Sequence, residues 1–176
     1  MEYQNQAIEN LLQKFKEEIG PDYDKYKNHV HRVFLNCLLI DDVKSNEEKY
    51  AIASVFHDIG IWTNQTFNYL EPSIEQARIQ LIKIGREDWI EEITLMISWH
   101  HKITSYRGKH EYIVENFRKA DWIDVSSGLL NFGVDKRKIK EARRKLPTLG
   151  FHLFLIKSTI KNFFKHPLNP LPMFKK

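Results

Sequence analysis

In the stretch YAIASVFHDIGIWT (residues 50–63), an apolar run leads directly into His57 and Asp58 and continues past Gly60 into further apolar residues. An apolar segment of this kind is typical of a protein core. A carboxylate moved out of water without a partner costs several kcal/mol. Asp58 therefore needs a cation, a set of hydrogen-bond donors or a metal ion beside it, and the rest of the chain has to supply that partner.

Length and composition indicate one globular domain. The chain has 176 residues, of which 42% are apolar and 28% charged, as is usual for a folded protein with a substantial core. No apolar run approaches the length of a membrane-spanning helix, and the N-terminal residues are too polar and acidic for a signal peptide. The single cysteine, Cys37, excludes an internal disulfide and fits a reducing compartment. We therefore expect a cytoplasmic protein without a membrane partner.

The net charge of +4 hides a gradient along the chain. Residues 1–60 contain 7 basic and 11 acidic side chains, whereas residues 121–176 contain 12 basic and 4 acidic ones. Much of the excess lies in DKRKIKEARRK (residues 135–145). A basic segment of this kind can bind polyanions, and the alternative is a solvated helix face.

Nearly every segment shows the apolar period of an amphipathic helix, and strand patterns and internal repeats are absent from the sequence. Residues 45–48 (S-x-x-E) and 73–76 (S-x-x-Q) have the form of capping boxes that open helices, and Gly60 and Gly85 are expected to end them. We expect helices at residues 8–19, 25–39, 45–60, 73–85, 87–101 and 151–165, two within 110–128, and a basic one after Asp135.

The predicted fold is therefore all-α, a compact helical bundle in one domain that spans residues 1–166. Prolines favour an extended path in residues 167–176, which we expect to form a C-terminal tail. The apolar stripe of the first helix suits either the core or a homodimer interface, and the sequence does not separate the two.

Histidines and aspartates gather in short stretches of the predicted helices. Five of the eight histidines fall in three such stretches, and two aspartates accompany them. Imidazole nitrogen and carboxylate oxygen are ligands that divalent transition metals accept, and rigid helices can aim them at one point. A metal ion would also neutralise Asp58. The candidate residues are His29, His31, His57, Asp58, His100, His101 and Asp121.

The order of these residues, H…HD…H…D, resembles the HD-domain superfamily of metal-dependent phosphohydrolases. The first histidine lies in an H-x-x-R-V motif formed by His29, Arg32 and Val33. An HD dipeptide alone is a weak signal, but an HD pair that ends an apolar helix and has the other elements in this order is much stronger. The resemblance covers residues 26–125, more than half of the chain.

The resemblance implies an all-helical fold and a set of metal ligands. In many relatives, histidines placed like His100 and His101 hold a second metal ion. Relatives with two metals often also have a histidine between the HD pair and these later histidines, and this chain has none there. The implied ligands of the first metal are His29, His57, Asp58 and Asp121.

Two ligand positions have close rivals in the sequence. His29 and His31 lie at similar angles to the apolar stripe of their helix, so periodicity does not separate them, and the motif resemblance favours His29. Asp124 lies one helical turn after Asp121 and is its natural rival. For the two later histidines, the alternative is a satisfied polar residue at a helix end.

A divalent ion in this setting predicts hydrolysis. Such an ion lowers the pKa of bound water from 15.7 toward about 7 and polarises a phosphoryl oxygen. Asp58 could orient that water or accept its proton. Arg32 and Lys102 are candidates to offset charge on the phosphoryl oxygens, with ion-pair or surface roles as the alternative. We expect a metal-dependent phosphohydrolase (Mn, Co, Ni, Mg, Zn or Fe) that acts on a small phosphorylated substrate, in particular a nucleotide.

Two other functions fit the same sequence. A few members of the superfamily hold two irons and activate O₂. Alternatively, the metal is structural and the basic segment at residues 135–145 binds nucleic acid, although no recognised nucleic-acid motif accompanies the charge. Trp62, Trp99 and Trp122 border the motifs and either line a substrate pocket or belong to the core. The loop at residues 61–73 is the segment expected to shape specificity.

Overall fold

The computed structural model describes residues 3–66 and 68–165, and the predicted tail at residues 167–176 lies outside this part of the chain. Every regular element in the described residues is helical and none is a strand, so the predicted all-α class is confirmed. The α-helices are α1 (Gln6–Leu12), α2 (Lys16–Ile19), α3 (Tyr23–Ile40), α4 (Glu47–Phe56), α5 (Gly60–Thr63), α6 (Leu70–Lys83), α7 (Ile90–Trp99), α8 (Glu111–Val125), α9 (Lys136–Lys145) and α10 (Phe151–Lys165), with 3-10 turns at Gln13–Phe15, Gly20–Asp22, Lys44–Asn46 and Glu87–Trp89.

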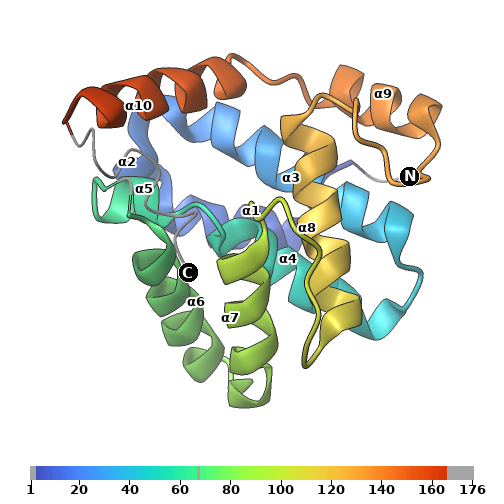
Figure 1. The fold of residues 1–176 in the computed structure, drawn as a ribbon. Helices are drawn as coiled ribbons and strands as arrows, with labels where there is room; N and C mark the ends of the chain where they lie inside the picture. The colour runs from blue at the N-terminus through green and yellow to red at the C-terminus, as the bar shows by residue number, and fades with distance from the viewer. Residues whose placement is uncertain (1–2, 67, 166–176) are drawn as a thin grey trace.

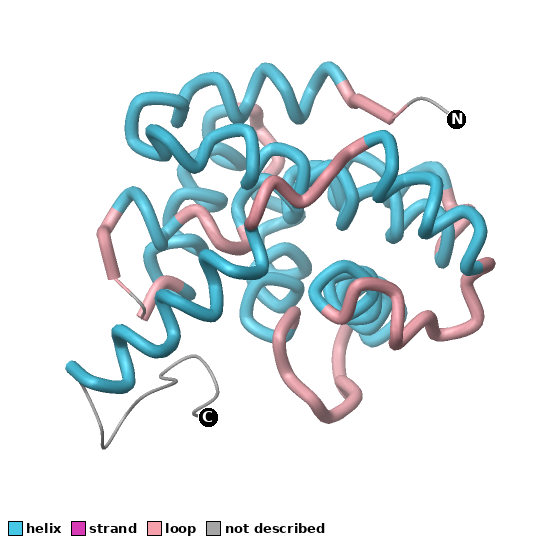
Figure 2. The backbone as a smooth tube through the Cα atoms, turned by 90° about the horizontal axis from the view of Figure 1, so that it is seen from above, coloured by secondary structure: helices cyan, strands magenta, loops and turns pink. Residues whose placement is uncertain are grey.

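The helices surround α3 and α8, which pack against each other (Figure 1). α4 also packs against α3, and α7 packs against both α6 and α8. In Figure 1, α9 and α10 lie along one edge of the molecule and α6 and α7 extend toward the opposite edge. Figure 2, seen from above the α9–α10 edge, shows the helices joined by loops, the longest of which connect α7 to α8 and α8 to α9. This arrangement brings the ends of α4 and α7 next to α3 and α8.

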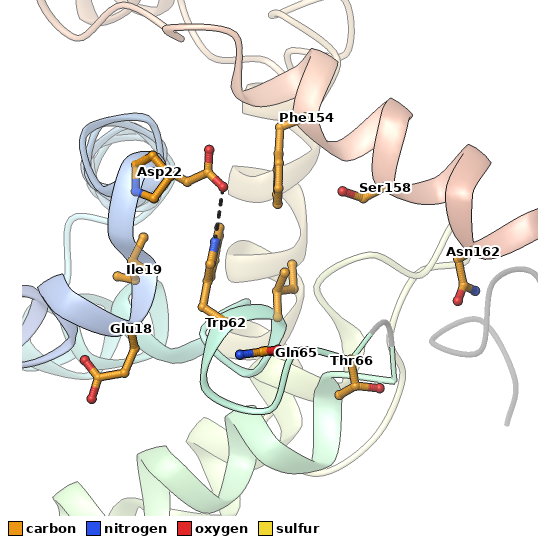
Figure 3. Close-up of a pocket in the computed structure, with 11 residues that line it drawn as sticks. Glu18, Ile19, Asp22, Trp62, Gln65, Thr66, Phe154, Ser158 and Asn162 are labelled. Atoms are coloured by element: carbon orange, nitrogen blue, oxygen red, sulfur yellow. Dashed lines mark hydrogen bonds between the residues drawn. The ribbon is translucent and has the colours of Figure 1, made fainter. Parts of the chain in front are cut away.

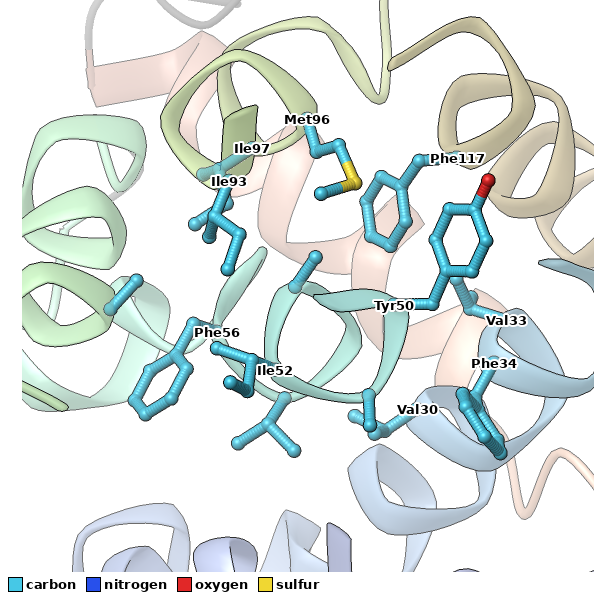
Figure 4. Packing of buried hydrophobic residues seen from close by; sticks show 14 of the residues in the cluster. Val30, Val33, Phe34, Tyr50, Ile52, Phe56, Ile93, Met96, Ile97 and Phe117 are labelled. Atoms are coloured by element: carbon cyan, nitrogen blue, oxygen red, sulfur yellow. The ribbon is translucent and has the colours of Figure 1, made fainter. Parts of the chain in front are cut away.

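Side chains from α3, α4, α7 and α8 form a common apolar core (Figure 4). Val33, Phe56, Met96 and Phe117 are each at most 1% exposed. Full burial of such a side chain stabilises the fold by roughly 1.5–3 kcal/mol. Because each of these four helices contributes to the core, their ends are held in fixed relative positions.

The two predicted capping boxes are wrong. Ser45 lies in the 3-10 turn that precedes α4, and no side chain caps that helix. Ser73 lies inside α6, where its buried Oγ accepts the Gly60 N–H at 2.9 Å. α6 begins earlier, at Leu70, because Pro72 falls in the first turn, where a missing N–H costs no helical hydrogen bond.

Gly60 does not end α4, contrary to expectation. α4 ends at Phe56 and Gly60 opens α5. A Cβ at position 60 would overlap the Tyr69 carbonyl oxygen, so glycine is required for the close approach of α5 to the start of α6. By contrast, Gly85 follows α6 with a φ of +68°, which confirms its predicted role as a helix end.

Three other predictions concern helix continuity. Residues 110–128 contain one helix, α8, rather than two, because buried side chains continue through its whole length. The first predicted helix is divided into α1 and α2 by a 3-10 turn. The basic segment forms α9 as predicted, with Asp135 Oδ1 accepting the Arg137 N–H at 2.8 Å.

No helix of the described residues is both long and apolar enough to cross a membrane.

Candidate metal centre

His57 and His100 occupy equivalent positions on two helices. Each directly follows its helix, α4 or α7, and its ring folds back onto the carbonyl group three residues earlier. The His57 Nδ1–H donates to the Ser54 carbonyl oxygen at 2.8 Å, and the His100 Nδ1–H donates to the Ile97 carbonyl oxygen at 2.7 Å. Carbonyls in the last turn of a helix lack intrahelical partners, so they are free to accept. Since a carbonyl only accepts, each ring carries a proton on Nδ1 and directs Nε2 elsewhere.

His29, on α3, is oriented by a carboxylate of α8. Its Nδ1 lies 2.7 Å from Asp124 Oδ2. Arg32 holds both oxygens of Asp124, with its Nε and Nη2 at 2.6 and 2.8 Å. Burial acts to raise the pKa of Asp124, but the Arg32 guanidinium and neighbouring histidines hold that pKa well below its usual range. The ionised carboxylate accepts the Nδ1–H of His29, and Nε2 again remains for another partner.

These Nε2 atoms meet the two motif aspartates. His29 Nε2 lies 2.9 Å from His57 Nε2, 3.6 Å from Asp121 Oδ1 and 3.8 Å from Asp58 Oδ2. His57 Nε2 lies 3.4 Å from Asp58 Oδ2 and 3.8 Å from Asp121 Oδ1. His100 Nε2 lies 3.4 Å from the other oxygen of Asp58, Oδ1. Two overlapping groups that could hold a metal ion result, and they share His57.

The cluster is rich in acceptors and poor in donors. All five residues are at most 5% exposed. Asp58 Oδ1 and Asp121 Oδ1 have no hydrogen-bond partner among the described residues. Leaving a buried carboxylate oxygen unpaired is unfavourable by several kcal/mol. A cation at the point where these atoms converge would remove this cost. It would also be the partner that the buried Asp58 carboxylate needs.

The protonation states also suit a cation. Burial lowers the pKa of His57 to about 3, so its imidazole is neutral near pH 7. Burial raises the pKa of Asp121 to about 6 against the opposing effect of the His100 and His29 rings. The pKa of Asp58 is lowered, because the adjacent His57 and His100 rings outweigh burial. The pKa of His100 is raised, because contact with Asp58 outweighs burial. Near pH 7 the cluster therefore offers the neutral imidazole of His57 beside carboxylates, whereas the raised pKa of His100 favours its protonated form next to Asp58.

The spacing of the candidate ligand atoms fits a metal ion. With metal–ligand bonds of about 2.1 Å, neighbouring ligand atoms are about 3.0 Å apart in an octahedron and about 3.4 Å apart in a tetrahedron. Five separations, which join the Nε2 atoms of His29 and His57 to each other and to the carboxylate oxygens of Asp58 and Asp121, run from 2.9 to 3.8 Å. A mixed imidazole and carboxylate set suits several divalent metals. The residues present could hold a divalent ion without rearrangement of the helices.

A cavity of about 170 Å³ lies beside the cluster. The Tyr69 hydroxyl lies in its wall, 3.5 Å from His100 Nε2. No lysine or arginine of the described chain lines this cavity. The lining residues are Asp58, Tyr69, His100, His101, Asp121, Trp122, Val125 and Leu155.

The other predicted residues have different surroundings. His31 Nε2 contacts Glu9 Oε1 at 2.8 Å and is not part of the cluster. Arg32 is buried against Asp124, which matches its ion-pair alternative. Lys102 is only partly buried and is not among the residues that line the cavity. His101 does line the cavity, and its ring packs edge-on against His100 with centroids 4.7 Å apart.

A larger surface pocket, of about 430 Å³, contains none of the clustered residues (Figure 3). Trp62 and Phe154 lie in its wall with their rings stacked at 10° and 5.6 Å between centroids. Trp122 instead lines the smaller cavity, and Trp99 packs against the main core. Trp62 also packs against that core, and of the three only Trp122 lines the cavity beside the cluster.

Sequence reasoning missed the groups that orient the ligands. From the sequence, Asp124 is only a rival of Asp121 for one ligand position. In the structure Asp121 lies in the cluster, and Asp124 contacts the Nδ1 of His29. The D-x-x-D spacing places both carboxylates on one face of α8, and this is the signal that could have found the pair. Tyr69 also escaped notice, although it lies in the loop at residues 61–73 that the sequence singles out for specificity.

No protein family, curated protein or solved structure matches the chain. A functional assignment therefore depends on the geometry of the cluster and on the order of its residues in the sequence.

Proposed function

We propose that this chain is a metal-dependent phosphohydrolase of the HD-domain type that cleaves the phosphoester of a small molecule, in particular a nucleotide. One observation carries the proposal. Three imidazole Nε2 atoms and two carboxylates converge from α3, α4, α7 and α8, in the sequence order H…HD…H…D, with the Nδ1 of each ring already hydrogen-bonded. Such outer hydrogen bonds are characteristic of histidines that bind metal ions.

The ligands of the ion would be His29, His57, Asp58 and Asp121. When bound, a divalent ion activates water and polarises a phosphoryl oxygen. Asp124 and the Ser54 carbonyl fix the rings of His29 and His57, so that each directs a lone pair inward. This preorganisation lowers the cost of assembling the site.

Asp58 and His100 are suited to handle protons. Asp58 Oδ2 faces the His29–His57 pair, while its Oδ1 faces His100 Nε2 at 3.4 Å. Both residues line the cavity, where a substrate would lie. Asp58 Oδ1 can accept a proton from an attacking water, and His100 Nε2 can donate one to the leaving oxygen. In an alternative arrangement, His57, Asp58 and His100 would hold the ion instead, because the single free lone pair of His57 Nε2 can bind one ion.

The cavity lining makes the reaction strongly metal-dependent. Phosphoryl transfer requires positive charge near the equatorial oxygens. The described residues that line the cavity include no lysine or arginine, and Arg32 is engaged by Asp124 outside it. We therefore propose that Arg32 acts as a positioning residue, through Asp124 and His29.

The test combines metal content with hydrolysis. Protein purified without added metal is expected to contain one equivalent per chain and to release phosphate from nucleotides when Mn²⁺, Co²⁺, Ni²⁺ or Mg²⁺ is present. Asp58→Ala should lose metal and activity while its circular dichroism is unchanged. Asp42→Ala, an exposed aspartate on another segment, is the matched control.

Two outcomes would change the assignment. Equal activity in Asp58→Ala, or no metal after reconstitution with divalent ions, would overturn the proposal. Two equivalents of iron, one of them lost in His100→Ala, together with O₂ consumption, would favour the oxygenase alternative.

A further inference from the structure

Exposed apolar side chains occur along most of the length of α10. Its large side chains recur at intervals of three and four residues, so they form one stripe on the helix surface. The opposite face of α10 packs inward, where Phe151 stacks on His29 with centroids 4.3 Å apart. The stripe, hereafter the α10 stripe, consists of Leu153, Ile156, Ile160, Phe163 and Phe164, which are 54, 55, 51, 50 and 80% exposed.

The sequence around the stripe is basic. Residues 147–176 contain five lysines and no aspartate or glutamate. The preceding helix, α9, is anchored by buried Ile139 and Ala142, and its other faces are solvent-exposed. Its exposed basic residues are Lys136, Arg137, Lys138, Lys140, Arg144 and Lys145. The proposed function uses none of these charges.

The two helices that carry the apolar and basic residues, α10 and α9, lie on the same side of the molecule. Figure 1 shows α9 and α10 one after the other along a single edge, and Figure 2 looks down on that edge. None of the described cavities is lined by the α10 stripe, so the stripe is a ridge rather than a pocket. A ridge of aromatic and aliphatic side chains beside a helix with exposed lysines and arginines suits the boundary between lipid headgroups and acyl chains.

Contrary to the expectation of no membrane partner, we propose that the α9–α10 edge docks on an anionic phospholipid surface. The α10 stripe enters the headgroup boundary, and the exposed lysines and arginines of α9 contact the anionic headgroups. One short apolar helix gives weak binding by itself, and a polybasic patch strengthens it by attraction to the charged leaflet. Association is peripheral and reversible, since no described helix can span a bilayer.

Charge argues against two other occupants. Antiparallel pairing of α10 with a second copy brings lysine-rich segments together with no acid on either side, which is unfavourable. Nucleic acid would engage α9 but would leave the α10 stripe exposed to water, without a role. Both occupants are distinguishable from lipid by experiment.

The test is co-sedimentation of the full chain with two kinds of vesicle. One kind contains phosphatidylcholine alone, and the other also contains roughly 30% phosphatidylglycerol, which makes its surface anionic. Binding is expected only to the anionic vesicles. Ile160→Glu should lower the partition coefficient at least about tenfold, because it places a charge in the apolar stripe. Ile79→Glu on α6 is the matched control, since both isoleucines are 51% exposed and the charge change is the same. That control should change binding less than about twofold.

A second variant tests the basic component. Replacement of Lys138, Lys140 and Lys145 by glutamine should weaken binding and flatten its salt dependence. Binding that is lost in this variant but unchanged in Ile160→Glu would overturn the proposal in favour of general polyanion binding. So would failure to bind anionic vesicles, or a solution dimer that Ile160→Glu dissociates. Unchanged circular dichroism and metal content in every variant separate these outcomes from misfolding and from failure of the proposed hydrolase.

Discussion

Asp121→Asn should stabilise the metal-free protein and weaken the metal-bound one. Asp121 and Asp124 lie one turn apart on α8 and are 4% and 1% exposed. Their surroundings differ, because Asp121 Oδ1 has no hydrogen-bond partner among the described residues, whereas Asp124 is paired with Arg32. The same substitution at the two positions is therefore expected to have opposite effects.

The magnitude follows from the pKa of Asp121, which burial raises from 3.8 to about 6. In the metal-free protein, folding favours the protonated form. The resulting contribution to stability is complete below the unfolded pKa and is lost as pH rises through about 6. Well above that pH, the ionised group disfavours folding by roughly 3 kcal/mol. The neutral amide removes this term, so Asp121→Asn should raise the free energy of unfolding at pH 7.5 by roughly 1–3 kcal/mol.

Asp124→Asn is the matched control. It breaks a buried ion pair and leaves Arg32 without its partner, which should lower the free energy of unfolding by roughly 3–5 kcal/mol. The assay is urea denaturation of chelator-treated protein at pH 5 and pH 7.5, repeated with excess divalent metal. The gain from Asp121→Asn should be about half as large at pH 5 as at pH 7.5, because pH 5 lies between the unfolded pKa of 3.8 and the folded pKa of about 6.

Metal addition should reverse the order of stabilities. A ligand at 100 times its Kd stabilises the native state by about 2.7 kcal/mol. The wild type should show a gain of this kind, and Asp121→Asn should show little. The reasoning is refuted if Asp121→Asn destabilises the metal-free protein as Asp124→Asn does, or if metal stabilises wild type and variant equally.

Three further predictions concern single contacts. Gly60→Ala should lower the free energy of unfolding in urea by roughly 1–3 kcal/mol, because the added Cβ meets the Tyr69 backbone. Gly108→Ala is the control, since its Cβ meets only the end of a tyrosine side chain. Equal losses of unfolding free energy in the two variants would contradict this reasoning. Asp41→Asn should cost roughly 1–3 kcal/mol at pH 7 in the same assay, since the carboxylate accepts the Tyr50 hydroxyl at 2.7 Å. Hydrogen bonds outweigh burial and lower the pKa of Asp41, so this difference should persist above about pH 4 and shrink as pH falls through the folded value; a constant difference would exclude a role for ionisation. Tyr69→Phe should retain full metal content yet reduce kcat/KM for phosphoester hydrolysis several-fold, because the hydroxyl lies 3.5 Å from His100 Nε2. Unchanged kinetics would show that the Tyr69 hydroxyl does not contribute to catalysis.

Local sequence features determined the all-α class, most helix positions and the residues of the cluster. Apolar periodicity predicted α3 and α10 closely, and Asp135 was identifiable as the start of α9, because these features depend on neighbours a few residues apart. The placement of His57 and Asp58 at the end of an apolar helix followed from the same local pattern.

Tertiary contacts determined the role of each polar side chain. His29 and His31 are equivalent by periodicity, but Asp124 on α8 engages the first and Glu9 on α1 engages the second. Ser73 has the sequence of a helix cap, yet it binds a backbone N–H from another helix. A helical pattern fixes the direction of a side chain around its own axis, whereas its partner depends on which helix packs on that side. That choice is made by the core, through contacts between residues far apart in the sequence.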